Sequence, residues 1–302
     1  MNINEYANKV ADEIRAKLGE DYDVRVNEVA KNNDKILHAV VVCEKDACIA
    51  PNVYVDGMFE RNLSTEEAAN EVMRIYEENK EAPQFADISS QFFDWDFVKD
   101  KVVMAVVNTA RNANLLAETV HREVEDLSII YKVALDVSGD GVATITIMDS
   151  HMKYWGKSVE ELHEVAVKNT SNILPYEVKP MSEKIREMFV EDGMPAEMVE
   201  MMYPALPQEQ EMYIVTNSKM INGAIYMFDN KALDEVADKV GSDLYILPSS
   251  IHEVIAISAN MTTPARASCL VREVNGSEVS PEEQLSDNVY YYDRENKTVK
   301  IA

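Results

Sequence analysis

Pairs of strand-like runs joined by short polar segments constrain the fold of this chain most strongly. The runs 22–29 and 35–43 flank a polar segment, and the runs 127–136 and 142–148 flank a glycine-containing segment. Connections this short join antiparallel neighbours, because a parallel pair needs a crossover of a dozen or more residues. Helical periodicity lies between the hairpins without the regular strand–helix–strand alternation of a doubly wound sheet. The sequence therefore predicts an α+β fold with mixed or antiparallel sheets and packed helices.

A change in pattern near residue 90 predicts two parts. The chain has 302 residues, enough for one large domain or two modest ones. The segment 80–91 contains Pro83 and little periodicity, which is typical of a connection. We therefore predict an N-terminal helix–strand–strand–helix domain over 1–90 and a second α+β domain over 91–302.

Capping residues mark the starts of several predicted helices. Ser64 and Ser158 are each followed three residues later by a glutamate, as in a capping box. Thr263 precedes Pro264, which is the order of a cap followed by proline at the first helical position. Expected helices cover residues 4–19, 64–79, 231–240 and 263–275, with one more beginning at Ser158. The run 223–228 fits either a strand or a helix.

The chain is strongly acidic. It holds 54 Asp and Glu against 29 Lys and Arg, a formal net charge of −25. So much negative charge repels phosphate backbones, so no direct nucleic-acid binding is expected. Two interpretations remain open, a well-solvated surface or a partner protein with a basic surface.

Cysteine usage and hydropathy predict a cytoplasmic protein. The N-terminal segment lacks the apolar core of a signal peptide, and no stretch approaches the ~18 apolar residues of a membrane span. No membrane partner is therefore expected. Cys43, Cys48 and Cys269 are an odd set without ligand spacing, which predicts neither a disulfide nor a zinc site.

Cofactor and metal motifs are weak. The segment 136–141 matches the first half of a calcium loop, but Ile147 occupies the position of the bidentate glutamate. Asp94 and Asp96 form a pair that could hold a divalent ion, although their aromatic neighbours favour a packed edge. The sequence contains neither a Walker A motif nor a dinucleotide-binding fingerprint. We therefore predict no cofactor and no metal.

Methionines concentrate between residues 181 and 202. Helical spacing favours core or inter-helix packing, since methionine fills gaps in cores. An adaptable groove for a partner is the alternative interpretation. The six residues are Met181, Met188, Met194, Met198, Met201 and Met202.

The segment 249–253 holds the densest cluster of reactive side chains. Ser249, Ser250, His252 and Glu253 include the residue types of a nucleophilic hydrolase site. These residues are consecutive, however, whereas triads assemble from separated segments, and no Gly-x-Ser-x-Gly motif surrounds either serine. A turn in which the serines and His252 satisfy the backbone after Pro248 is the structural interpretation.

Several stretches resemble an uncharacterised bacterial domain-of-unknown-function family over nearly the whole chain. The most specific is Leu247-Pro248-Ser249-Ser250-Ile251-His252-Glu253-Val254, joined by Tyr213–Asn217, Gly223-Ala224, Val271–Asn275 and Pro281-Glu282-Glu283-x-Leu285-Ser286-Asp287. The resemblance carries no assigned activity. It implies a location, because its polar residues place any binding site at the strand ends that carry Asn217, Ser249, Ser250, His252 and Glu253.

We therefore expect a binding or regulatory protein that acts through protein–protein contact rather than by catalysis. An inhibitor of a basic, nucleic-acid-binding partner is one form of this role. The alternative is a hydrolase that uses Ser249 or Ser250 with His252 and Glu253.

Overall fold

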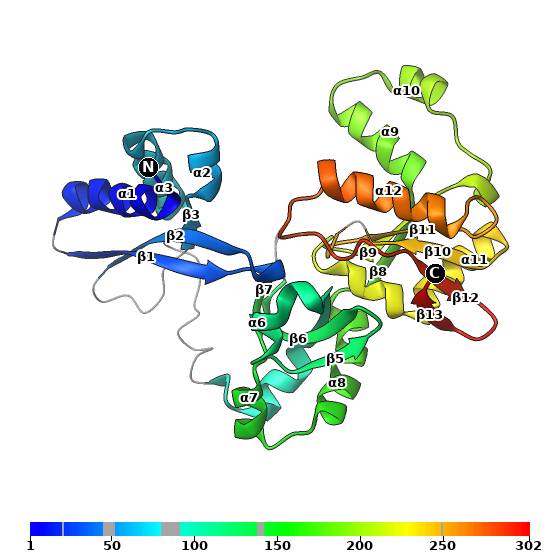
Figure 1. Cartoon of the computed structure of the whole chain (residues 1–302), viewed down its shortest axis with the longest axis horizontal. Helices are drawn as coiled ribbons and strands as arrows, with labels where there is room; N and C mark the ends of the chain where they lie inside the picture. Colours follow the sequence, from blue (N-terminus) through cyan, green and yellow to red (C-terminus); the bar gives the residue numbers. More distant parts are fainter. Residues whose placement is uncertain (20, 45–51, 80–90, 138–141, 249) are drawn as a thin grey trace. The chain divides into compact units, whose positions relative to one another are not determined.

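The computed structural model describes residues 1–19, 21–44, 52–79, 91–137, 142–248 and 250–302 (Figure 1). The chain divides into two compact units, 1–93 and 94–302. The connection predicted at 80–91 lies outside the described residues except for Gln91. Both units combine helices with antiparallel sheets, so the predicted α+β class is confirmed. Among the described residues, no helix is long and apolar enough to cross a membrane.

The first unit is a three-stranded antiparallel sheet packed with helices. Its strands follow the order β1-β2-β3, and the β1–β2 hairpin turns at Asn33 and Asp34, which adopt left-handed φ angles of 61° and 50°. Asparagine and aspartate tolerate this region better than other non-glycine residues. The elements are α1 (Ile3–Leu18), β1 (Tyr22–Ala30), β2 (Ile36–Glu44), β3 (Asn52–Tyr54), α2 (Asp56–Glu60) and α3 (Thr65–Asn79).

The apolar face of α1 forms the core of the first unit. Tyr6, Val10 and Ile14 recur every four residues and are almost completely buried. They pack in one cluster with Val40 of β2 and Val72 of α3. Residues four apart lie on one side of a helix, so this spacing determines which face of α1 is buried.

The second unit begins with a small sheet of four strands. β6 pairs with β4 along one edge, while β5 and β7 pair with successive parts of its other edge. The elements are α5 (Trp95–Val98), β4 (Val102–Asn108), α6 (Ala113–Leu116), β5 (His121–Val124), β6 (Leu127–Asp136), β7 (Ala143–Thr146), α7 (Asp149–Trp155) and α8 (Val159–Ile173).

A six-stranded antiparallel sheet forms the larger part of the second unit, in the order β13-β12-β10-β11-β9-β8. Its strands are β8 (Tyr176–Pro180), β9 (Tyr213–Asn217), β10 (Leu244–Leu247), β11 (Val254–Ser258), β12 (Tyr290–Asp293) and β13 (Thr298–Ile301). The helical elements are α9 (Met181–Glu191), α10 (Ala196–Met202), the 3₁₀ helix η5 (Gly223–Phe228), α11 (Asn230–Val240) and α12 (Pro264–Ser277).

Helices α11 and α12 cover opposite faces of this sheet. Tyr292 pairs with Leu244, so both lie on one face, and the Tyr292 hydroxyl donates to Asp234 of α11 at 2.6 Å. Leu247 and Val271 of α12 belong to a buried cluster on the other face. Because successive strand residues alternate between faces, both faces of the central strands are apolar.

Candidate functional site

The end of β9 and the turn before β11 lie side by side. Val254 pairs with Val215 in antiparallel register, so the residues that precede Val254 approach those that follow Val215. The Thr216 hydroxyl donates to the backbone oxygen of His252 at 2.8 Å. The structure thus brings Asn217 next to the turn that carries His252.

Asn217 uses its side chain to close the loop that follows β9. Its Oδ1 accepts from the backbone N–H groups of Lys219 at 3.0 Å and Ile221 at 3.4 Å. Its Nδ2 donates to the Ile221 oxygen at 2.8 Å. The residue is 1% exposed. Both ends of the amide are therefore occupied by local backbone, as in an asparagine-stabilised turn.

His252 joins three segments of the second unit. Its Nδ1 accepts from the backbone N–H of Asn222 at 3.2 Å, which places the proton of the neutral ring on Nε2. Nε2 lies 3.6 Å from Oε1 of Glu283. Sequence reasoning missed Asn222 and Glu283 as neighbours of His252, although Glu283 lies in a segment that carries the family resemblance.

Gly223 is required where η5 meets this turn. A Cβ atom at Gly223 would lie 2.3 Å from Oγ1 of Thr216, 2.5 Å from the His252 oxygen and 2.8 Å from the Asn217 nitrogen. Two of these three atoms are backbone and cannot move without disturbing β9 or the turn. The glycine therefore permits the close approach of the two segments.

The Ser250 side chain hydrogen-bonds to the backbone of the turn. Ser250 Oγ accepts from the backbone N–H of His252 at 3.0 Å. Among the described residues, no hydrogen bond joins the Ser250 hydroxyl to a histidine ring. Ser249 lies outside the described residues. A general base must reach the hydroxyl proton, and His252 directs Nδ1 to Asn222 instead.

Glu253 is a buried carboxyl group in this turn. Burial raises the pKa of Glu253 above its ordinary value, and the charges of His252 and Lys184 offset part of the increase. A carboxyl group with a raised folded-state pKa stabilises the folded protein while it is protonated. This stabilisation is lost as pH rises through the folded-state pKa. The environment of Glu253 therefore favours its neutral form.

A polar network anchors the segment before β12. Asp126, between β5 and β6, accepts from Ser286 Oγ at 2.7 Å, from Asn288 Nδ2 at 3.0 Å and from the Tyr290 hydroxyl. Arg111 forms an ion pair with Asp287. Burial raises the pKa of the Tyr290 hydroxyl, with the hydrogen bond to Asp126 as a further cause. The network joins the two sheets of the second unit.

The structure contains no obvious metal centre in the part that it describes. No group of three or more His, Cys, Asp or Glu side chains there could hold an ion. Asp94 caps α5 by accepting from the Asp96 backbone at 3.0 Å, and Asp96 pairs with Lys99 at 2.6 Å. Cys269 is an exposed free thiol, and Cys48 lies outside the described residues. Most of the partial calcium-loop match, 138–141, is also outside them.

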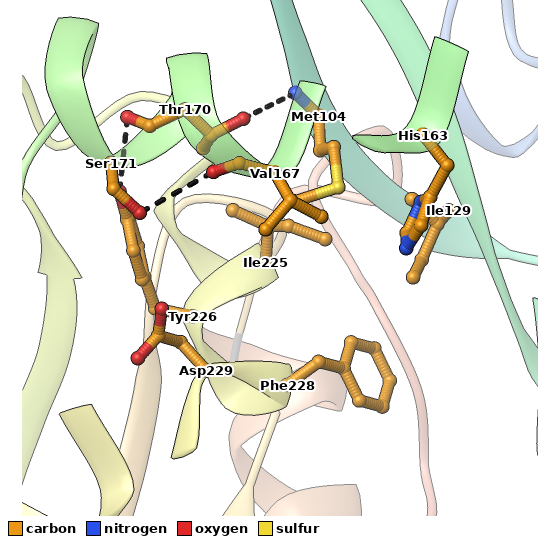
Figure 2. Close-up of a pocket in the computed structure, with 10 residues that line it drawn as sticks. All are labelled: Met104, Ile129, His163, Val167, Thr170, Ser171, Ile225, Tyr226, Phe228 and Asp229. Carbon is orange, nitrogen blue, oxygen red and sulfur yellow. Dashed lines mark hydrogen bonds between the residues drawn. The ribbon is translucent and has the colours of Figure 1, made fainter. Parts of the chain in front are cut away.

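A small cavity of about 170 Å³ lies among α8, β4 and η5 (Figure 2). His163 lines it, and its Nδ1 forms a hydrogen bond of 3.0 Å with the Tyr131 hydroxyl. Burial lowers the pKa of His163 and raises that of Tyr131 to about 12, so both are neutral near pH 7. Tyr226 donates to the Leu174 oxygen at 2.5 Å. This volume is below the roughly 300–1,000 Å³ of pockets for drug-sized ligands.

Among the described residues, several of the most exposed apolar side chains lie on α9 and α10, which we call the methionine hairpin (Met181–Met202). Figure 1 shows the two helices outside the layer formed by α12. α9 has no buried residue, and Val199 is the buried residue of α10. Met201 is 86% exposed and Met198 is 52% exposed. Core packing is therefore the wrong interpretation for four of the six methionines, namely Met188, Met198, Met201 and Met202.

A few contacts hold the methionine hairpin together. The rings of Phe189 and Tyr203 stack with centroids 4.9 Å apart, and Arg186 donates to the Tyr203 oxygen at 3.3 Å. At the start of α9, the buried Glu211 carboxylate accepts from the Ser182 hydroxyl at 2.5 Å. The hairpin is thus attached at its base, while Met188, Met198, Met201 and Met202 stay exposed.

Acidic residues border the groove between the two helices. This groove has a volume of about 620 Å³ and is lined by Val190 and Val199 together with Glu183, Glu187, Glu191 and Glu200. Between residues 181 and 211 the sequence holds eight Asp and Glu against Lys184 and Arg186. The described lining of the groove therefore combines apolar and acidic side chains with the basic Arg186, and the exposed methionines lie outside this lining.

Comparison with known proteins places the chain in a family. A model described as a family of unknown function (DUF5688) matches residues 3–294. The chain belongs to this family. The predicted resemblance to a domain-of-unknown-function family is thereby confirmed. No curated protein and no solved structure matched.

The DUF5688 match covers both candidate regions. The β10–β11 turn with Asn217, Gly223 and His252 and the methionine hairpin all lie within residues 3–294. In the turn, Ser250 and His252 accept hydrogen bonds from backbone N–H groups, whereas in the hairpin four methionines are exposed. Of these two regions of the DUF5688 chain, the hairpin has the properties of a binding surface.

Proposed function

We propose that this protein is a non-catalytic binding protein that docks a basic, amphipathic segment of another protein on the methionine hairpin. The observation that carries the proposal is a pair of helices with exposed methionines and almost no buried residue, bordered by glutamates. Covering a basic segment in this way would regulate the protein that carries it. Inhibition of a nucleic-acid-binding partner is one such outcome.

The apolar part of the recognition comes from the methionines. Met188, Met198, Met201 and Met202 are each more than half exposed. Methionine side chains are unbranched and polarisable, so they adapt to the different apolar anchors of a partner helix. Helix-in-groove recognition uses such anchors at spacings of three, four and seven residues. The hairpin therefore suits an amphipathic helix rather than an extended peptide.

The charge part of the recognition favours a cationic partner. Eight acidic and two basic residues between positions 181 and 211 leave this segment with a charge of −6, within a chain of −25. Complementary charge increases the association rate and suppresses partners of like charge. Lysines or arginines that flank the apolar anchors would face Glu187, Glu191 and Glu200 at the groove.

The geometry of the β10–β11 turn supports a non-catalytic role. His252 accepts from the Asn222 backbone, and Ser250 accepts from the His252 backbone. Ser250 therefore hydrogen-bonds within the turn, and His252 hydrogen-bonds to the loop after β9. The hydrolase alternative would need Ser249 or Ser250 to reach an imidazole nitrogen.

The test is fluorescence anisotropy with a labelled peptide of about 14 residues, roughly four helical turns, with leucines on one face and lysines elsewhere. We expect binding to the native protein, and Met198→Glu or Met201→Glu should weaken it at least about tenfold, or about 1.4 kcal/mol. Met261→Glu is the matched control, because Met261 is 44% exposed outside the hairpin, and it should leave the affinity unchanged.

Two further peptides separate shape from charge. One has the same composition with its leucines dispersed around the helix, and the other carries glutamates in place of lysines. We expect both to bind at least about tenfold more weakly. Equal binding of the dispersed peptide, or equal weakening by Met261→Glu, would mean that only non-specific charge attraction operates, which contradicts the proposal.

A further inference from the structure

An apolar cavity of about 310 Å³ lies between α12 and the six-stranded sheet. Leu247 of β10 and Ile255 of β11 are register partners and line it from the sheet. Val271 and Val274 line it from the helix. A volume of this size lies within the range of small-molecule pockets.

Two methionines form another wall of the cavity. Met181 and Met212 line it, and the backbone N–H of Met181 donates to the Met212 oxygen at 2.8 Å. This bond fixes the backbone of both residues while leaving their flexible side chains able to adjust. The wall can therefore adapt to the outline of a ligand.

Asn275 is the single polar residue among the described residues that line the cavity. It is 4% exposed, and its Nδ2 donates at 2.9 Å to the Ser286 oxygen and at 2.9 Å to Oδ1 of Asp287. Its Oδ1 is buried and accepts no hydrogen bond from any described residue. A buried acceptor without a donor is rare in folded proteins because it loses the hydrogen bonds of water.

The orientation of the Asn275 amide follows from its neighbours. Nδ2 faces two acceptors, the Ser286 carbonyl and the Asp287 carboxylate. A rotated amide would set its oxygen against both of these oxygens, so the nitrogen belongs where it is. The unsatisfied oxygen is therefore a fixed property of the site.

We propose that this cavity binds a neutral, mainly apolar alcohol or phenol whose hydroxyl donates to Asn275 Oδ1. The apolar walls would contact the apolar part of the ligand. Its hydroxyl would donate to Asn275 Oδ1, the unsatisfied acceptor of the described lining. No lysine or arginine in the described part of the chain lines the cavity, and Asp287 lies beside Asn275. A carboxylate ligand would therefore be buried without a counter-charge, which is strongly unfavourable.

The volume indicates the size of the ligand. A cavity of about 150 Å³ accommodates benzene, so a cavity of twice that volume suits a two-ring phenol or a medium-chain alcohol. The proposal does not depend on the binding role of the methionine hairpin, because its ligand and its key residue are different.

The experiment uses 2-naphthol as the probe, measured by isothermal titration calorimetry with the full chain. We expect 2-methylnaphthalene, which lacks the donor, to bind at least about fivefold more weakly, as for the loss of one hydrogen bond. The anion 2-naphthoate should bind at least about tenfold more weakly. Equal binding of 2-naphthol and 2-methylnaphthalene, or no detectable binding of 2-naphthol, would overturn the proposal.

A filled cavity gives the matched variant test. Val274→Phe adds a ring at a residue that lines the cavity, and it should reduce 2-naphthol affinity at least about tenfold. Ala265→Phe adds the same ring to α12 at an exposed position outside the cavity and should leave the affinity unchanged. Equal affinity of Val274→Phe and the native chain would refute the site.

A spectroscopic measurement on the unmodified sequence covers the case in which Val274→Phe does not fold. With ¹³C-labelled methionine methyl groups, 2-naphthol should shift the signals of Met181 and Met212 but not that of the exposed Met261. Unshifted signals for both Met181 and Met212 at saturating 2-naphthol would place the ligand elsewhere and overturn the proposal.

Discussion

At Gly223 the backbone of η5 approaches β9 and the β10–β11 turn too closely for a side chain. The atoms that a methyl group at this position would meet belong to Thr216, His252 and Asn217, all within 2.8 Å. His252 and Asn217 both use their side chains to fix backbone segments around this point. The residues that looked most like a catalytic cluster therefore depend on one glycine for their arrangement.

We predict that Gly223→Ala lowers the free energy of unfolding of the second unit by about 1–3 kcal/mol, because overpacking forces backbone shifts. Urea denaturation followed by tryptophan fluorescence measures this unit, since both tryptophans, Trp95 and Trp155, lie in 94–302. Gly276→Ala is the control. A Cβ at Gly276 meets nothing within 4 Å, and alanine favours the helix, so stability should stay the same or rise by up to about 1 kcal/mol. Equal effects of the two substitutions would contradict the close-approach argument.

At the scale of elements, two helices of equal length differ in what covers them. α9 and α11 each have 11 residues. α11 buries Leu233, Val236 and Val240 along one face, whereas α9 has no buried residue. Isolated helices this short are marginal in water, so packing supplies most of their stability. The two helices should therefore open with different free energies.

We expect backbone amides of α9 to exchange with deuterium at least about tenfold faster than those of α11, because local opening of α9 exposes little apolar surface that was buried. Hydrogen–deuterium exchange read by mass spectrometry measures both helices in one sample. The leucine–lysine peptide should slow exchange in α9 and α10 and leave α11 unchanged. Equal protection of α9 and α11 in the free protein would show that the hairpin is already stably covered.

Amphipathic periodicity predicted burial for the methionines, and this is where the element-scale prediction was wrong. The periodic pattern of residues 181–202 is present, and α9 and α10 form there. Whether an apolar face is buried depends on a second element being available to cover it, which a local pattern does not specify. Val199 and the stacked Phe189 and Tyr203 pack the two helices on each other. They leave Met198 and Met201 exposed.

Net charge acts on the whole molecule in two opposite ways. A charge of −25 destabilises the compact state by self-repulsion, and the same charge attracts a cationic partner. Salt screens both effects, because the Debye length falls to roughly 10 Å at 0.1 M ionic strength. Stability and partner affinity should therefore change in opposite directions with ionic strength.

We predict that raising sodium chloride from about 0.02 to about 0.5 M increases the melting temperature and weakens binding of the leucine–lysine peptide roughly tenfold or more. Differential scanning calorimetry and anisotropy measure the two quantities on the same preparation. Potassium chloride should give the same changes, because screening does not depend on the identity of the cation. A melting temperature that falls with either salt would show that self-repulsion is not a significant cost.

The sequence by itself determined the local structure and the family. Ser158 with Glu161 and Thr263 with Pro264 mark the starts of α8 and α12 as predicted, since capping depends on residues within one turn. Strand alternation and short connections likewise predicted the antiparallel hairpins β1–β2 and β6–β7. These features are decided by neighbours in the chain, so a linear pattern is enough to find them.

Only the tertiary structure decided which surfaces and atoms remain unsatisfied. Asp126 accepts hydrogen bonds from Ser286 and Tyr290, which lie more than 150 residues away in the sequence. No local pattern predicts that network. The same holds for the acceptor of Asn275 beside an apolar cavity and for the exposed face of α9. Burial and hydrogen-bond satisfaction depend on which distant segment arrives at a residue. The sequence left a partner groove at the methionines as one of two interpretations, and their exposure decided for it, whereas the Asn275 site becomes visible only once the chain is folded.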